Sequence, residues 1–196
     1  MSSPINLQHV NVKLLAKNPE QVDLEPLIPV FHNWIEGQIF EELLLDVADY
    51  RHVQAGPGVV LIGHQANYSV DNTDNRLGVR YNRKAPLEGS NQDRLQQAAR
   101  AALTAFERLE SEARLNGKLR FNGQEIKVYV NDRLMAPNSD STREALKPEL
   151  GAFLGKLFQG SEYKLSHGSD PRSLVAVEVK ANRAFSVSEL LANLAS

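Results

Sequence analysis

Residues 59–83 read VVLIGHQANYSVDNTDNRLGVRYNR, and this segment says most about the architecture of the chain. Val59 to Val70 opens with a fully apolar run and has the residue types of one long strand. The polar segment 71–75 favours a chain reversal, because Asp and Asn readily form turns. Arg76 to Arg83 then predicts a returning strand, so the segment indicates an antiparallel hairpin.

The segments before this hairpin predict a half-buried strand, a helix and a further strand. Residues 7–16 alternate, with Val10, Val12 and Leu14 on one face and polar residues on the other. Residues 24–36 have apolar side chains at helical spacing and end at a glycine, and residues 43–50 read as a strand that turns at 54–58. The middle of the chain is therefore expected to be an antiparallel meander.

The segments after the hairpin indicate three more helices. Ser90 followed by Asp93 is typical of a capping box at the start of a helix over about 91–116. Asn122-Gly123 favours a tight hairpin between residues 119–121 and 124–130. A helix is expected over 143–159, then a hairpin of residues 163–167 and 174–181, and a short final helix.

The two halves of the chain share an order of strand, helix, strand, strand and helix. Leu24-x-Pro26 and Leu146-x-Pro148 also correspond at an offset of 122 residues. These observations predict one α+β domain over 1–196, a mostly antiparallel sheet with helices mainly on one face, and a duplicated β-α-β-β unit spanning 5–117 and 118–196. If the unit is duplicated, the strands of the two copies can merge into one sheet, and a cleft where the copies meet is a natural ligand site. This order resembles the duplicated βαββ units of the GyrI-like and SOUL small-molecule-binding families, a resemblance of fold that does not fix function.

Composition excludes several classes of function. The chain has no cysteine, which removes disulfides, thiol nucleophiles and thiolate metal sites. The five histidines show no metal-ligand spacing, no motif indicates a cofactor, and the net charge of −2 argues against general nucleic-acid binding. No apolar run is long enough for a membrane helix, and no signal peptide is recognised, so we expect a cytoplasmic protein.

The segment 63–71 holds the highest density of chemically capable side chains. His64 is the candidate general base, with Tyr68 or Asp71 as its partner. Within one continuous strand, however, residues four apart lie roughly 13 Å apart, so His64 could not touch Tyr68. The alternative, which the spacing favours, is that the histidine and the tyrosine line the core and bond to neighbouring strands.

A second group of candidates lies on the returning strand. Arg76, Arg80 and Arg83, with Asn67 on the preceding strand, could bind a carboxylate or a phosphate. The alternative is a charged strand face that protects the sheet from aggregation. Tyr81 is expected on the face opposite Arg80, which weakens the case for stacking on nucleic-acid bases.

The sequence therefore favours a non-catalytic domain that binds a small molecule or a protein partner, and this hypothesis includes a homo-oligomer. The alternative is an acid–base enzyme that works around His64 without redox or thiol chemistry. Nucleic-acid binding through the strand Arg76 to Lys84 is the third hypothesis.

Overall fold

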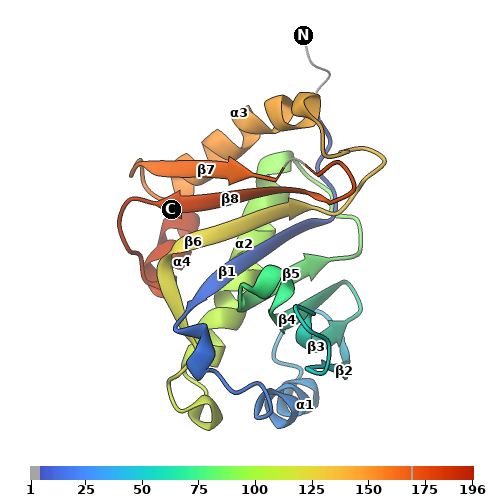
Figure 1. Cartoon of the computed structure of the whole chain (residues 1–196), viewed down its shortest axis with the longest axis vertical. Helices are drawn as coiled ribbons and strands as arrows, with labels where there is room; N and C mark the ends of the chain where they lie inside the picture. The colour runs from blue at the N-terminus through green and yellow to red at the C-terminus, as the bar shows by residue number, and fades with distance from the viewer. Residues whose placement is uncertain (1–4, 169) are drawn as a thin grey trace.

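The computed structural model describes residues 5–168 and 170–196. Its core is one eight-stranded antiparallel sheet in the order β2-β3-β4-β5-β1-β6-β8-β7 (Figure 1). The strands are β1 (Val10–Lys17), β2 (Leu44–Tyr50), β3 (Gly58–Gly63), β4 (Ala66–Asp71), β5 (Gly78–Arg83), β6 (Arg120–Val130), β7 (Tyr163–His167) and β8 (Val175–Ala181). The α-helices are α1 (Leu27–Gly37), α2 (Asn91–Glu110), α3 (Asp140–Leu157) and α4 (Val187–Ala195).

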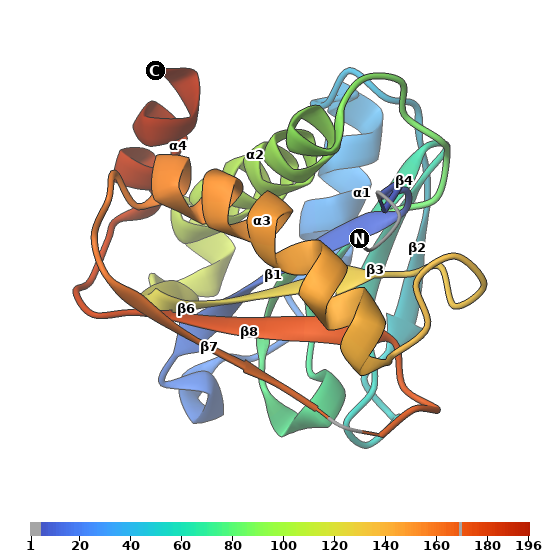
Figure 2. The same ribbon diagram turned by 90° about the horizontal axis from the view of Figure 1, so that it is seen from above.

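The α-helices lie together on one side of the sheet, which Figure 2 shows from above, whereas the short 3-10 turn Thr73–Asn75 lies on the other side. The predicted α+β fold with helices mainly on one face is thereby confirmed. We call the two sides of the sheet the covered face and the helix-free face. None of the helices among the described residues is long and apolar enough to span a membrane.

Alternation along each strand builds the covered face. On β1, Val12 and Leu14 pair with Tyr81 and Val79 of β5. These side chains are almost fully buried, and α2 packs over β1 and β5. The inner stripe of α2 is rich in alanine, which lets the helix lie close to the sheet. The capping box of Ser90 and Asp93 is present at its start, and the helix ends at Glu110, before the expected residue 116.

The antiparallel pair of β1 and β6 joins the strands of the first half of the chain to those of the second, with β5 beside β1 and β8 beside β6. We call this pair the seam. The internal duplication itself remains a prediction. The Leu-x-Pro match gives it no support, because Pro26 precedes α1 whereas Pro148 lies inside α3.

The expected single strand from Val59 to Val70 is wrong, because the chain reverses at His64 and Gln65. Leu61 pairs with Tyr68 across this turn, and Ile62 pairs with Asn67. The reversal changes which residues share a face: Tyr68 lies on the covered face, whereas Val60 and Ile62 lie on the helix-free face. The local sequence lacks the Asn-Gly or Asp-Gly signal of a two-residue turn.

The expected hairpin at Asn122-Gly123 is also wrong. These residues lie inside the single strand β6, which pairs with β1 through Phe121 on one side of them and through Ile126 on the other. The register shifts between the two pairings, as at a β-bulge, and Gly123 has a positive φ of 85°. Pairing with β1 therefore keeps this segment extended.

Candidate functional site

The structure separates the three candidate catalytic residues. His64 is exposed in the turn between β3 and β4. Tyr68 points to the covered face, beside Tyr81, and Asp71 is buried on the helix-free face. The acid–base group proposed from the sequence is therefore not assembled in this structure.

The four candidate ligand-binding residues divide in the same way. Asn67 and Arg80 lie on the helix-free face and line the same hollow. Arg83 points to the covered face. Tyr81 also points to the covered face, opposite to Arg80, as the sequence predicted. Arg76 is exposed and pairs with Glu125 at 3.1 Å. Only two of the four residues come together.

A row of amide and phenol side chains crosses the helix-free face on four neighbouring strands. The register pairs Asn67 of β4 with Asn82 of β5, Asn82 with Asn11 of β1, and Asn11 with Tyr129 of β6. Directly opposed side chains on neighbouring strands lie about 5 Å apart, so these groups form a continuous line. We call this line the amide row.

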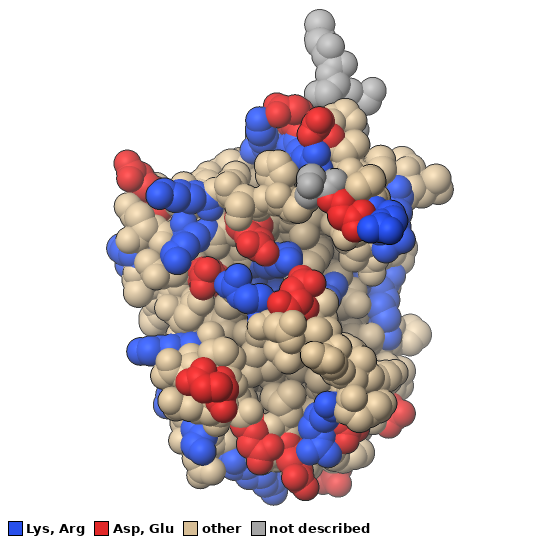
Figure 3. All heavy atoms as spheres, viewed as in Figure 1, with Lys and Arg blue, Asp and Glu red and all other residues tan. Residues whose placement is uncertain are grey.

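A charged row runs beside the amide row, two residues away from it along each strand. It contains Ser69 of β4, Arg80 of β5, Lys13 of β1, Lys127 of β6 and Glu178 of β8. Figure 3 looks onto this face and shows basic and acidic side chains gathered around a recess in its middle. The two rows together cross the seam.

Several of these groups are deeply buried although no α-helix covers this face, and the short 3-10 turn Thr73–Asn75 lies against Lys13 and Asp71. Lys13 has 1% of its surface exposed, Asp71 2% and Asn11 none. Lys13 Nζ donates to Asp71 Oδ1 at 2.5 Å, and the same oxygen accepts from the backbone nitrogen of Thr73 at 3.1 Å. Burial lowers the pKa of Lys13, and the carboxylate of Asp71 opposes that shift. Asp71 thus holds both the lysine and the short turn at 73–75.

Arg80 and Tyr129 stand at the centre of the polar surface. The guanidinium of Arg80 lies 4.4 Å from the centroid of the Tyr129 ring, a cation–π contact. Lys127 Nζ lies 3.0 Å from Asp74 and 3.1 Å from Glu178. Burial raises the pKa of Tyr129, which keeps its phenol neutral and able both to donate and to accept.

The charges of this face are balanced by its own residues. The cations are Lys13, Arg80 and Lys127. The nearby carboxylates are those of Asp71, Asp74 and Glu178, all within 4 Å of one of these cations. A surface balanced in this way does not favour a strongly anionic ligand.

Several buried polar atoms on this face have no hydrogen-bond partner within the described protein. They are Asn11 Oδ1, Asn11 Nδ2, Asn67 Oδ1, Asn82 Oδ1, Tyr129 Oη and Arg80 Nε. The first five belong to the amide row, and the last is next to it in the charged row. Buried polar groups in folded proteins nearly always have partners. We therefore expect these atoms to form hydrogen bonds with water or with a ligand.

Two hollows open onto the rows, with Arg80 as a common wall. The hollow over the seam has a volume of about 380 Å³ and is lined by Arg80, Lys127, Tyr129 and Glu178, among others. We call it the seam hollow. The other, which we call the amide hollow, has a volume of about 280 Å³ and lies over β3, β4 and β5. Its lining includes Asn67, Asn82, Val60, Ile62 and Tyr50.

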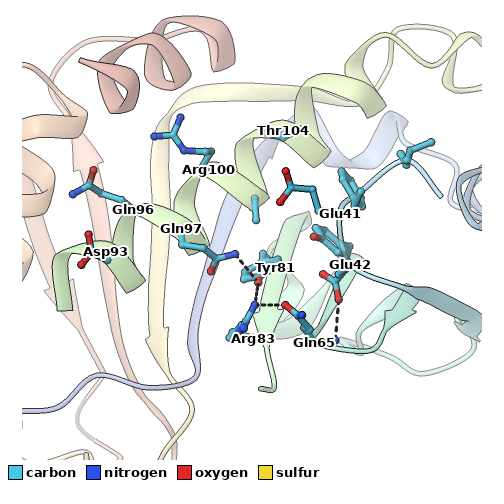
Figure 4. Close-up of a pocket in the computed structure, with 14 residues that line it drawn as sticks. Glu41, Glu42, Gln65, Tyr81, Arg83, Asp93, Gln96, Gln97, Arg100 and Thr104 are labelled. Carbon is cyan, nitrogen blue, oxygen red and sulfur yellow. Dashed lines mark hydrogen bonds between the residues drawn. The ribbon is translucent and has the colours of Figure 1, made fainter. Parts of the chain in front are cut away.

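A larger cleft of about 580 Å³ lies on the covered side, beside α2 (Figure 4). Tyr68 is part of its lining, and burial together with the carboxylate of Glu42 raises the pKa of this tyrosine. Glu42 Oε2 accepts from the backbone nitrogens of Gln65 and Ala66 at 3.0 and 2.9 Å. Glu42 thus holds the turn between β3 and β4 next to the cleft.

Several polar groups of this cleft are hydrogen-bonded to one another or to the backbone. Gln97 Nε2 donates to Tyr81 Oη at 2.9 Å, and Arg83 Nη1 donates to Gln65 Oε1 at 3.1 Å. Arg83 Nε donates to the carbonyl oxygen of Ala85 at 2.8 Å. Every unpartnered buried side-chain nitrogen or oxygen atom in the described part of the chain belongs to the helix-free face instead. We therefore take the helix-free face as the candidate functional site.

Sequence reasoning missed most of this site. Asn11 and Lys13 were assigned to the polar side of a half-buried strand, and Lys127 and Tyr129 were not singled out. The available signal was alternation itself, because polar residues at every second position of β1 and β6 had to share a face. The sequence did not show that these two strands lie side by side in the sheet.

Comparison with family models, curated proteins and solved structures finds no match to this chain. The resemblance to the GyrI-like and SOUL families therefore stands on the order of elements alone. The argument for function depends on the site.

Proposed function

We propose that this chain binds a small polar molecule, without transforming it, on the helix-free face across the seam. The observation that supports this proposal is the set of unpartnered buried atoms in and beside the amide row. A buried polar group without a partner lowers the stability of the fold by about 1–3 kcal/mol. Folded proteins usually keep such unfavourable groups at functional sites. A ligand that supplies donors and acceptors here would offset this cost.

The charges and the size of the site favour an uncharged or zwitterionic ligand. Asp71, Asp74 and Glu178 already balance the three cations. The seam hollow, at about 380 Å³, lies within the roughly 300–1,000 Å³ typical of small-molecule sites. Because His64, Tyr68 and Asp71 lie apart, we favour binding over acid–base catalysis. A protein partner, oligomerisation and a cytoplasmic location remain predictions from the sequence.

The test is a nuclear magnetic resonance titration of ¹⁵N-labelled protein with acetamide, D-ribose and glycine as probes. At least one probe should shift the backbone amides of Asn11, Asn82 and Tyr129 in a saturable way. Tyr129→Phe removes one unpartnered hydroxyl while keeping the ring under Arg80, so it should weaken that response. Tyr163→Phe, at the far edge of the sheet, is the matched control and should leave it unchanged.

Two outcomes would overturn the proposal. In the first, none of the three probes shifts an amide on the helix-free face. In the second, the saturable shifts gather around Tyr81 and Gln97 in the cleft beside α2, which would move the site to the covered side.

A further inference from the structure

The amide hollow has a chemistry that differs from that of the seam hollow. One side presents the amides of Asn67 and Asn82, which are directly opposed on β4 and β5. The Oδ1 atoms of both are buried and without a partner. The other side is apolar, with Val60 and Ile62 of β3 and the ring of Tyr50 at the end of β2. The hollow therefore combines two hydrogen-bonding amides with an apolar wall.

Two side-by-side amides select a particular kind of ligand edge. Each asparagine amide carries an acceptor and a donor in one plane, so it pairs best with a group that offers a donor next to an acceptor. Nucleobases have such edges, and asparagine binds the edge of adenine through two hydrogen bonds. A saccharide would present hydroxyl groups to the apolar wall as well, where they would have no partner.

The apolar wall suits a flat ring. Tyr50 lines the hollow and is 42% exposed, so part of its ring is free to contact a ligand. Stacking of a base on an aromatic side chain contributes to binding with little dependence on the identity of the base. Val60 and Ile62 point to the same side of the sheet, since they pair with Ser69 and Asn67. A planar ring could thus lie against this wall with its edge on the amides.

Arg80 connects the two hollows. It lines both of them, and its Nε atom is buried without a partner. Its guanidinium is engaged with Tyr129 and lies 3.7 Å from Asp71, so its charge is already balanced. A ligand extending past Arg80 would therefore enter the seam hollow, where Lys127 and Glu178 offer a donor and an acceptor.

From these observations, and resting on the function proposed above, we infer that the amide hollow binds a planar nitrogen heterocycle of the nucleobase type. The ring edge bonds to Asn67 and Asn82, and the ring face lies against Tyr50, Val60 and Ile62. A polar substituent on the ring extends past Arg80 toward the seam.

The experiment titrates the full chain with adenine and with cytosine, followed by backbone amide shifts and by calorimetry. Indole is the matched control probe, because it is flat and of similar size to adenine but has one donor and no ring acceptor. Adenine or cytosine should shift the amides of Asn67 and Asn82 and bind about tenfold or more tightly than indole, the ratio expected for one good two-bond amide contact.

Variants separate the amide contacts from the stacking contact. Asn67→Ala and Asn82→Ala should each weaken binding of the base about tenfold, whereas Asn33→Ala, on an exposed face of α1, should have no effect. Tyr50→Phe should keep affinity and Tyr50→Ala should lower it about fivefold to tenfold. Thermal unfolding of each variant checks that the fold is retained, which we expect because these side chains are only partly buried.

The outcomes distinguish this inference from the function on which it rests. If acetamide, D-ribose or glycine shifts the seam amides but neither base binds, the heterocycle assignment fails and the proposed function stands. Equal affinity for indole and adenine, or unchanged affinity in Asn82→Ala, also overturns the assignment. If none of the probes shifts the helix-free face, both proposals fail.

Discussion

The two faces of the sheet are buried by different means. On the covered face, β1 contributes Val12 and Leu14 to an apolar core under α2. On the helix-free face, the same strand contributes Asn11 and Lys13, which are just as deeply buried although no α-helix covers them. The covered face is explained by folding alone, because burying apolar area stabilises the protein. The helix-free face costs stability, so it is the face on which to look for function.

The largest expected effect belongs to the covered face. Phe106 of α2 is fully buried and contacts Phe121, with a distance of 5.9 Å between the ring centroids. Phe106→Ala should lower the free energy of unfolding by about 4 kcal/mol, because it leaves a cavity in a packed core. Urea unfolding followed by circular dichroism measures this loss. A loss below about 1 kcal/mol would show that the covered face is not the tightly packed core described here.

The second-largest effect concerns the buried ion pair of Lys13 and Asp71. It distinguishes the free-energy cost of burying the pair from the cost of removing one partner. Lys13→Met should destabilise the protein by about 3 kcal/mol, because it removes the nearer cation from the buried carboxylate of Asp71 and leaves only Arg80, at 3.7 Å. Adding Asp71→Asn should restore most of that loss, since an uncharged amide can still accept from the backbone nitrogen of Thr73. Urea unfolding of the two single variants and the double variant gives the coupling. If the losses in the free energy of unfolding of the two single variants add up in the double variant, Lys13 and Asp71 do not act as a coupled pair.

The smallest effect has the opposite sign. Asn11 is fully buried, and neither amide atom has a partner within the described protein. Asn11→Leu has the same branching without the polar atoms, so it should raise the free energy of unfolding by about 1–2 kcal/mol. The midpoint of thermal unfolding, measured without ligand, reports the change. A decrease would indicate that the amide of Asn11 serves the fold and not a ligand.

The fold was predictable wherever the pattern is local. The alternation of residues 7–16 and the capping box at Ser90 both led to the observed β1 and α2, because side-chain direction follows the period of the element. The break at His64 and the bulge at Gly123 were not predictable in this way. Each depends on which strand pairs with the segment, and that is a contact with residues distant in the chain.

The candidate site was predicted in part. Asn67 and Arg80 were named from the sequence, and both line the amide hollow. His64 and Arg83 were named with them, but the turn between β3 and β4 leaves His64 exposed, and Arg83 faces the cleft beside α2. The expected continuous strand from Val59 to Val70 hid the turn at His64, whereas the direction of Arg83, three residues after Arg80, follows from alternation along β5.

The amino-acid sequence by itself determined which residues of each strand share a side and which side of each helix is apolar, since these follow from backbone geometry over a few residues. Only the tertiary structure decided that β1 pairs with β6 and that the polar sides of the four neighbouring strands β4, β5, β1 and β6 lie side by side. Strand order is set by packing the whole apolar surface at once. It placed Asn11, Asn67, Asn82 and Tyr129 in one line, although they are far apart in the chain.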